Sequence, residues 1–502
     1  MENVKYLDNH TLNSSEIVLT SDLAAEFPIY IYVNDNKNYI CYSNSIHDLL
    51  NSSYIKKPLS VSSEGLSFLL QSGVVPPPKT IYKNVFVVGI GDKVLIKNDN
   101  EAIELIFSHK FPFMSVDRFH EDEIVPDNDL LLELLLQATI SRIDPSKPTF
   151  FFHSAGKDSN SILLALAEGG YQEKITCVCQ RTLGSQDESS ISKIVAEKLG
   201  FKHVILEQPT TISKEFFASI IEHFTNTPLP WTDGVTLAFP AYPLQLPALR
   251  ESNLVDGSGN DVYIGNIPPR SEYRKQRLTS LTQKFHWFAD HMNSASVFSS
   301  IRKTRAEWCG LGGFLFSDTK QIYPSAISVL PYWTMQSKER QLWDYIDFRS
   351  DIRGTIVDVH IFNQKVRNVS YVWKSNPIYP WCDKEVAKYL SKLPEKYVFD
   401  RHKLKNKLIL RTMLKERIGL DSDEIGKRGY GYDNLKILQS LIDNAKHEIT
   451  TCNFWDKTAV TKKFNSLYKK AYSTDKYYAL GRNLLLRLYL LSLWLNHNRY
   501  IN

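Results

Sequence analysis

The sequence has little of the cysteine that builds metal clusters and disulfide frameworks. Its 502 residues include six cysteines, which are scattered and form no Cys-x-x-Cys pair. This spacing argues against a zinc site and against a disulfide-stapled fold. Reduced, buried thiols are typical of a cytoplasmic protein, and we expect that localisation.

Long apolar runs and strong net charge are also missing. No run reaches the roughly 18 apolar residues that a membrane span requires, and Arg487 interrupts the nearest stretch, 484–495, which predicts a buried helix. The first residues are polar, without the apolar core of a signal peptide. The net charge of +5 is small for this length. The sequence therefore predicts neither a membrane partner nor a nucleic-acid partner.

The first 112 residues have the composition of a β-rich domain. Residues 27–33 and 38–43 are strand-like runs around an Asn-Asp-Asn turn, which predicts a hairpin. A helix is expected near 64–71, and a second pair of strands at 85–89 and 93–96. Residues 113–128 are polar and contain Pro126, so we interpret them as a linker.

The rest of the chain, 129–502, predicts an α/β domain with a helical C-terminal part. After a leucine-rich helix at 129–141, short apolar runs alternate with helical patterns. Strands are expected at 149–153, 175–179, 204–206 and 254–255, and helices at 159–168 and 188–199. This alternation predicts a doubly wound parallel sheet. The last 170 residues read mainly as helix.

A small polar loop follows the first of these buried strands. Its residues are Ser154, Ala155, Gly156, Lys157, Asp158 and Ser159. Backbone N–H groups at the start of a helix attract phosphate oxygens, and the two hydroxyls and the lysine add to this attraction. A carboxylate repels phosphate, so Asp158 predicts a bound Mg²⁺. The alternative is an ordinary serine-rich turn between a strand and a helix.

A second glycine-rich loop, Asp256–Gly265, follows the strand at 254–255. Gly257 and Gly259 would allow close approach of a ligand, and Asp261 is a second candidate for binding Mg²⁺. Ligands of doubly wound sheets bind beyond the carboxyl ends of the strands, where both loops are expected. The alternative is a simple Gly/Asn turn.

These segments, in this order, resemble those of the asparagine synthetase family, which includes β-lactam-forming and lasso-peptide macrolactam synthetases. The first loop is similar to the SGGxDS loop of N-type ATP pyrophosphatases, with Ala155 in place of one glycine. The other segments that resemble the family are 43–46 (ASE), 73–82 (GYVPGPRTI), 187–200 (DE…LG), 256–265 (GEGSDEVFGG), 367–383 (RN…PFLD), 406–411 (GKxxLR) and 427–432 (RxKxGF).

The resemblance implies a degenerate, truncated glutaminase-like domain over 1–112 and an ATP pyrophosphatase domain over 129–502. ATP would lie with its triphosphate on the two loops, including Gly257 and Gly259, and its adenine on the strand ends near Val178. Asp158 and Asp261 would hold Mg²⁺. The catalytic lysine of RxKxGF aligns with Gly429. Lys427 or Arg428 would then supply the positive charge of that lysine. The alternative is that these two residues only form the solvated end of a helix.

Two departures from the family narrow the expected chemistry. Glu2 follows Met1 where glutamine-dependent members have their cysteine nucleophile. The amine would therefore come from free ammonia, from a separate amidase or from the substrate. Ser258 and Val262 replace the two glutamates of GEGSDE. Because Ser258 is a poor base, β-lactam formation is not supported.

We therefore expect an ATP-dependent synthetase that adenylates a carboxylate, releases pyrophosphate and couples the acyl group to an amine. The expected substrates belong to specialised metabolism, for example a lasso-type precursor peptide with a partner protease. The alternatives are an ammonia-dependent asparagine synthetase, an amidotransferase acting on glycan carboxylates, and a non-catalytic scaffold.

Overall fold

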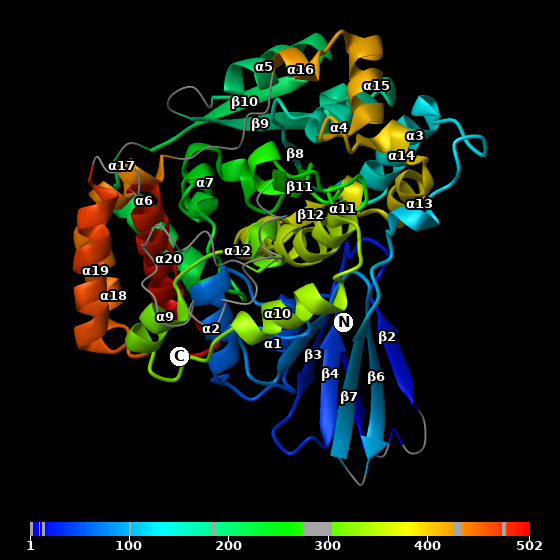
Figure 1. Ribbon diagram of the computed structural model, residues 1–502. Coiled ribbons are helices and arrows are strands. Elements are labelled where there is room, and N and C mark those ends of the chain that lie inside the picture. Colours follow the sequence, from blue (N-terminus) through cyan, green and yellow to red (C-terminus); the bar gives the residue numbers. More distant parts are fainter. Residues whose placement is uncertain are drawn as a thin grey trace.

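The computed structural model describes residues 4–9, 11–12, 16–99, 102–182, 187–209, 211–274, 304–425, 433–473 and 478–502. Figure 1 shows a β-rich N-terminal part at one side of the molecule and an α/β part above it, with a group of C-terminal helices beside both.

Two antiparallel sheets form the N-terminal part. The first has the order β1 (Lys5–Asp8), β4 (Tyr39–Ser43), β3 (Ile29–Val33) and β5 (Val85–Val88). The second has the order β2 (Ile17–Thr20), β6 (Asp92–Asp99) and β7 (Ala102–His109). Helices α1 (Ile46–Asn51) and α2 (Ser63–Ser72) follow the first hairpin.

The structure confirms the hairpin predicted at 27–33 and 38–43, which is the β3–β4 pair. The predicted pairing of 85–89 with 93–96 is wrong, because β5 pairs with β3 while β6 pairs with β2 and β7. Val88 on β5 and Val94 on β6 contribute to the same buried cluster. The chain therefore crosses between two sheets at Gly89–Gly91 instead of folding back within one.

A five-stranded parallel sheet forms the centre of the second part. Its order is β10 (Lys202–Glu207), β9 (Ile175–Arg181), β8 (Thr149–Phe152), β11 (Asn253–Asp256) and β12 (Asn376–Ile378). The first four in chain order, β8 to β11, were predicted, and β12 was not. The order reverses between β8 and β11, which is the switch point of a doubly wound sheet.

The two faces of this sheet pack into different cores. Phe150 and Leu254 belong to a cluster with α6 (Lys214–Asn226) and α12 (Gln364–Trp373). Phe151 and Val255, one residue further on each strand, belong to a cluster with α3 (Asn128–Ile140), α4 (Lys157–Glu168) and α5 (Ser189–Lys198). Successive side chains of a strand point to opposite faces, so helices cover both faces, as predicted.

The remaining elements are mostly helices, in agreement with the prediction that the last 170 residues are mainly helical. They are α7 (Tyr242–Gln245), α9 (Phe316–Ile322), α10 (Leu330–Glu339), α11 (Tyr345–Arg349), the π-helix η9 (Ser350–Asn363), α13 (Lys384–Lys392), α14 (Glu395–Val398), α15 (Leu408–Ile418), α16 (Ser422–Ile425), α17 (Asn434–Ser440), α18 (Ile442–Thr451), α19 (Lys457–Ala471) and α20 (Tyr478–His497), with a short hairpin of β13 (Phe399–Asp400) and β14 (Lys405–Asn406). Short 3₁₀ turns complete the chain, and one of them, η1 (Ser115–Asp117), lies in the predicted linker.

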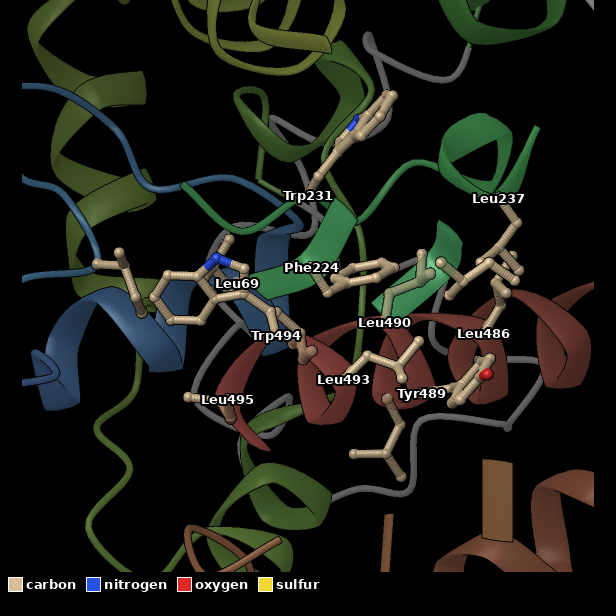
Figure 2. Close-up of a cluster of buried hydrophobic side chains, with 14 of the residues drawn as sticks. Leu69, Phe224, Trp231, Leu237, Leu486, Tyr489, Leu490, Leu493, Trp494 and Leu495 are labelled. Atoms are coloured by element: carbon tan, nitrogen blue, oxygen red, sulfur yellow. The ribbon is translucent and has the colours of Figure 1, made fainter. Parts of the chain in front are cut away.

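The stretch 484–495 is a buried helix, as predicted, and forms most of α20. Figure 2 shows Leu490 of α20 beside Phe224 of α6 and Leu486 of α20 beside Leu237, all in one buried cluster. The Trp494 indole donates a hydrogen bond to the Thr227 carbonyl at 3.0 Å. Among the helices that the structure describes, none has the length and apolar character needed to cross a membrane. The six cysteines are buried and unpaired by disulfides.

Candidate nucleotide-binding site

The two predicted loops lie in contact at the switch point of the parallel sheet. The first leaves β8 and enters α4, and the second leaves β11. A Cβ atom on Gly257 would lie 3.3 Å from the backbone of Ser159, so a larger residue would push the loops apart. The Asn260 amide donates a hydrogen bond to the Asp158 carboxylate at 2.7 Å. The geometry therefore joins the loops into one site, which is where such sheets bind ligands.

A pocket of about 300 Å³ opens beside the two loops. The predicted residues that line it are Ser154, Gly156, Asp158, Ser159, Val178, Gly257, Gly259 and Asp261. The aromatic rings of Phe239, Tyr242 and Phe362 form part of its apolar wall. The other two predicted loop residues, Ala155 and Lys157, line a neighbouring pocket of about 330 Å³. Asp158, Gly156 and Asp261 line both pockets, so the two spaces meet at the loops.

The first loop is organised for an anion at the start of α4. Gly156 is the residue before the helix, and its N–H donates to the Ser154 hydroxyl at 3.1 Å. The first turn of any α-helix leaves backbone N–H groups without intrahelical partners, and these groups attract phosphate. The N–H of Ala155 instead donates to the Glu188 carboxylate at 3.1 Å. Glu188 thus fixes the loop's conformation.

Lys407 joins the two predicted magnesium ligands. Its ammonium nitrogen lies 2.6 Å from an Asp158 oxygen and 2.8 Å from an Asp261 oxygen. Only 6% of the residue is exposed. Burial alone lowers the pKa of Lys407, but the charges of Asp158 and Asp261 outweigh it and raise the pKa above its usual range. Lys407 is therefore charged, and it holds the two carboxylates together.

The sequence analysis did not identify Lys407 as a site residue. It lies just before α15 with φ of 59°, in the left-handed region. Its position far along the chain from both aspartates gave no local signal. The one available sign was its place in segment 406–411, which resembles GKxxLR.

The neighbouring pocket is lined by charged side chains of both signs. They are the cations Lys157, Lys407 and Arg411 and the carboxylates Asp158, Glu188, Asp261 and Asp423. Burial is the largest influence on Lys157, and with the nearby Arg411 it lowers the pKa of that lysine to about 8. A polyanion in this pocket would raise the pKa again, because it favours the charged amine. With Mg²⁺ neutralising Asp158 and Asp261, the three cations of the pocket would match a di- or triphosphate.

The carboxylates of Asp158 and Asp261 fit a magnesium ion bound with a nucleotide. Each carboxylate places one oxygen within 2.8 Å of the Lys407 ammonium, so the two oxygens lie close together. Within the part of the chain that the structure describes, His, Cys, Asp and Glu side chains form no group of three or more that could hold a metal. Mg²⁺ commonly binds through one or two carboxylates, phosphate oxygens and water, so two carboxylates are a sufficient protein contribution.

Asp358 is a further carboxylate in the site that the sequence analysis missed. It lies on the π-helix η9 and lines the 300 Å³ pocket with Gly257 and Asp261. Burial raises the pKa of Asp358 to about 7. The Asn266 amide donates to its Oδ2 at 2.8 Å. A carboxyl group with this pKa exchanges a proton near neutral pH, as acid–base catalysts do. No helical pattern in the sequence pointed to it.

The other predicted positions have structural roles or lie elsewhere. Lys427 and Arg428 lie outside the described residues. Ser258 is bonded within its own loop, since its N–H donates to Asp256 at 2.9 Å and its hydroxyl to the same oxygen. Val262 is buried in the core. Neither Ser258 nor Val262 supplies a base to the pocket.

No protein-family model matches the chain. A search of curated proteins finds similarity to a protein of Methanocaldococcus jannaschii named "Putative asparagine synthetase (glutamine-hydrolyzing) 2". The two are 23% identical over 264 residues, which are 51% of this chain and 48% of that protein. The chain thus spans about half the length of the curated relative it matches. Over that half, the chain is distantly similar to a protein named as an asparagine synthetase.

Proposed function

We propose that this protein is an ATP-dependent carbon–nitrogen ligase that activates a carboxylate as its acyl-adenylate. The observation that carries the proposal is the convergence of Asp158 and Asp261 on Lys407 at the switch point of the parallel sheet. Two carboxylates beside a helix N-terminus and a buried cation suit Mg²⁺ and a triphosphate better than either phosphate or metal alone.

ATP would span the two connected pockets. Its adenine would lie in the apolar part of the 300 Å³ pocket, between Val178 and the ring of Tyr242. Its β- and γ-phosphates would lie toward Lys157, Lys407 and Arg411 in the neighbouring pocket. Magnesium held by Asp158 and Asp261 would neutralise part of the phosphate charge.

In the first step, a carboxylate oxygen of the substrate attacks the α-phosphorus, and the bond to pyrophosphate breaks. Negative charge develops on the leaving pyrophosphate, beside the cations of the second pocket. Preorganised charges of this kind stabilise a transition state without further reorganisation. The protein's contribution to this step is therefore positioning and electrostatics.

In the second step, an amine attacks the acyl carbon, the bond to AMP breaks, and the nitrogen loses a proton. Asp358 lines the same pocket, and its raised pKa suits it to accept that proton. The products are an amide and AMP.

For the substrate, we propose a carboxylate of a specialised metabolite or a peptide, including a lasso-type macrolactam precursor. The six cysteines are all buried, which supports an amine that does not come from glutamine hydrolysis by an exposed thiol of this chain. The similarity to a protein named as an asparagine synthetase supports amide formation in general.

The test is to incubate the protein with ATP, Mg²⁺ and a panel of carboxylates, and to measure pyrophosphate and AMP. We expect pyrophosphate release that depends on the carboxylate. Asp158→Ala should lower it by about a hundredfold, because one metal ligand and its electrostatic effect are lost. Asp443→Ala, at an exposed position of α18, is the matched control. Release of phosphate instead of pyrophosphate, or full activity of Asp158→Ala, would contradict the proposal.

A further inference from the structure

A second cavity lies between the β-rich N-terminal part and the helices around α10. Its volume of about 580 Å³ is larger than that of the pocket beside the loops. The N-terminal side supplies residues of β6, β7 and 110–114, and the other side supplies α10 and η9. Figure 1 shows α10 beside the ends of the N-terminal strands. The two cavities share no lining residue.

Three charged residues that line this cavity, Asp92, His109 and Arg340, belong to a network completed by Asp351, which does not line it. Asp351, which is 1% exposed, lies 2.9 Å from Nε2 of His109 and 2.6 Å from Nε of Arg340. The other ring nitrogen of His109 lies 2.7 Å from Asp92. Burial lowers the pKa of His109, but the bonds and charges of Asp351 and Asp92 outweigh it and raise the pKa to about 9. His109 is thus charged, and the four groups neutralise one another.

Hydrogen-bond donors remain beyond this network. Nη1 of Arg340 donates to Gln336, and its Nη2 has no partner among the residues that the structure describes. Within the described ranges, the Lys110 ammonium and the Tyr332 hydroxyl also have no hydrogen-bond partner. Both residues line the cavity. These three groups can each donate a hydrogen bond, and two are cationic. The lining also contains the exposed Glu339 carboxylate, which lies 3.6 Å from Nη1 of Arg340. The three donors match an anionic group.

Aromatic and aliphatic side chains also line the cavity. Phe107, Phe111, Tyr332 and Trp343 line it, and the Phe111 and Trp343 ring centroids are 6.2 Å apart. The Arg340 guanidinium lies over the Trp343 ring, 5.5 Å from its centroid. Binding sites for small organic molecules typically combine such an apolar wall with a few placed polar groups, in volumes of about 300–1,000 Å³.

We propose that this cavity is a second small-molecule site, which binds an aromatic carboxylate. The ring would lie against Trp343 and Phe111, and the carboxylate would accept hydrogen bonds from Lys110, Tyr332 and the free side of Arg340. The π-helix η9 lines this cavity with Thr355 and Ile356, and the nucleotide pocket with Asp358. The proposal stands whether or not the chain is a ligase, because it concerns binding alone.

The test is calorimetric titration of the full chain with 3-phenylpropanoate and with its neutral analogue 3-phenylpropanamide. We expect a Kd near or below about 1 mM for the acid and at least about tenfold weaker binding of the amide. Lys110→Ala and Tyr332→Phe should each weaken binding of the acid and leave binding of the amide unchanged. Lys338→Ala, an exposed lysine of α10 that does not line the cavity, is the control.

Ser108→Trp separates this cavity from every other place where a carboxylate could bind. Ser108 is an exposed lining residue, so an indole there should fill part of the cavity while every residue of the charge network is kept. We expect it to abolish binding of both compounds. The proposal is overturned if the acid does not bind, if acid and amide bind equally, or if binding persists in Ser108→Trp.

Discussion

Replacing Lys407 with glutamine tests the arrangement of the two aspartates directly. In the protein, the Lys407 ammonium lies 2.6 Å from Asp158 and 2.8 Å from Asp261. The two oxygens are thus within about 5.5 Å of each other, where two unit charges repel by about 3 kcal/mol at an effective dielectric of 20. Glutamine is one atom shorter than lysine and keeps a polar end group, but it removes the charge that offsets this repulsion.

Two effects of opposite sign should follow from this replacement. Breaking a fully buried ion pair costs about 3–5 kcal/mol, and the partial exposure of both carboxylates lowers this to about 2–3 kcal/mol of unfolding free energy. In the variant, a bound Mg²⁺ should relieve the repulsion between Asp158 and Asp261 in place of the lost ammonium. Mg²⁺ also no longer has to compete with Lys407 for the oxygens of these two residues. We therefore expect Lys407→Gln to bind Mg²⁺ at least about tenfold more tightly than the wild type, which is about 1.4 kcal/mol.

Calorimetric titration of the nucleotide-free protein with MgCl₂ measures this affinity. Lys407→Arg keeps the charge and should resemble the wild type. The double variant Lys407→Gln/Asp158→Asn should lose the gain, since one carboxylate is neutral. If Lys407→Gln binds Mg²⁺ no more tightly than the wild type, or if the double variant keeps the gain, the two aspartates do not form a magnesium site.

Three other changes give separate outcomes. Asp358→Asn should leave carboxylate-dependent ATP–pyrophosphate exchange within about threefold of the wild type while amide formation falls by about a hundredfold, since only the amine step needs a proton acceptor; equal losses would contradict that role. His109, whose pKa rises from 6.5 to about 9, should stabilise the fold fully below pH 6.5 and lose that contribution as pH rises through 9. This rise in pKa corresponds to about 3 kcal/mol of unfolding free energy, and solvent screening at this partly exposed side chain lowers the contribution to about 1–2 kcal/mol. Urea unfolding of the wild type between pH 6 and 10 should show this loss of stability, and urea unfolding of His109→Gln should not. Gly259→Ala places a Cβ 2.5 Å from Cys382 Sγ at φ of +120°, so thermal unfolding should show a loss of about 2 kcal/mol or more, whereas Gly170→Ala, with open space at φ of +77°, should show only the smaller backbone cost.

The predicted strands of the parallel sheet were recognisable because local sequence determines them. Residues 149–153 and 254–255 are apolar runs that end in small polar loops, and such runs are typical of strands buried on both faces. β12 was missed because it is only three residues long and contains Pro377. It forms by pairing with β11, a strand far away in the sequence, and no local sequence pattern predicts this pairing.

The pairing of β5 and β6 shows the same limit in the N-terminal part. Two strand-like runs separated by a short turn predict a hairpin, but the choice of partner depends on which apolar faces meet. Here Val88 and Val94, on strands of two different sheets, belong to one buried cluster. Sequence patterns identified the strands and could not identify their neighbours.

The same limit applies to the candidate site, where some residues could be predicted from the sequence and others could not. Asp158 and Asp261 were predictable because each follows a strand that ends at the same edge of the sheet. Lys407 reaches them from just before α15, and Asp358 from a π-helix. Their side chains depend on tertiary packing, and neither lies in a loop whose chemistry could be judged alone.

The position of α20 has a consequence for how the chain is made. Its leucines complete a core that also contains Leu69 of α2 and Phe224 of α6, and the Leu59 N–H donates to the Tyr500 carbonyl at 2.8 Å. Synthesis proceeds from the N-terminus, so these earlier elements leave the ribosome with an apolar surface whose cover does not yet exist. During that interval the nascent chain has a stretch of exposed core that chaperones can recognise.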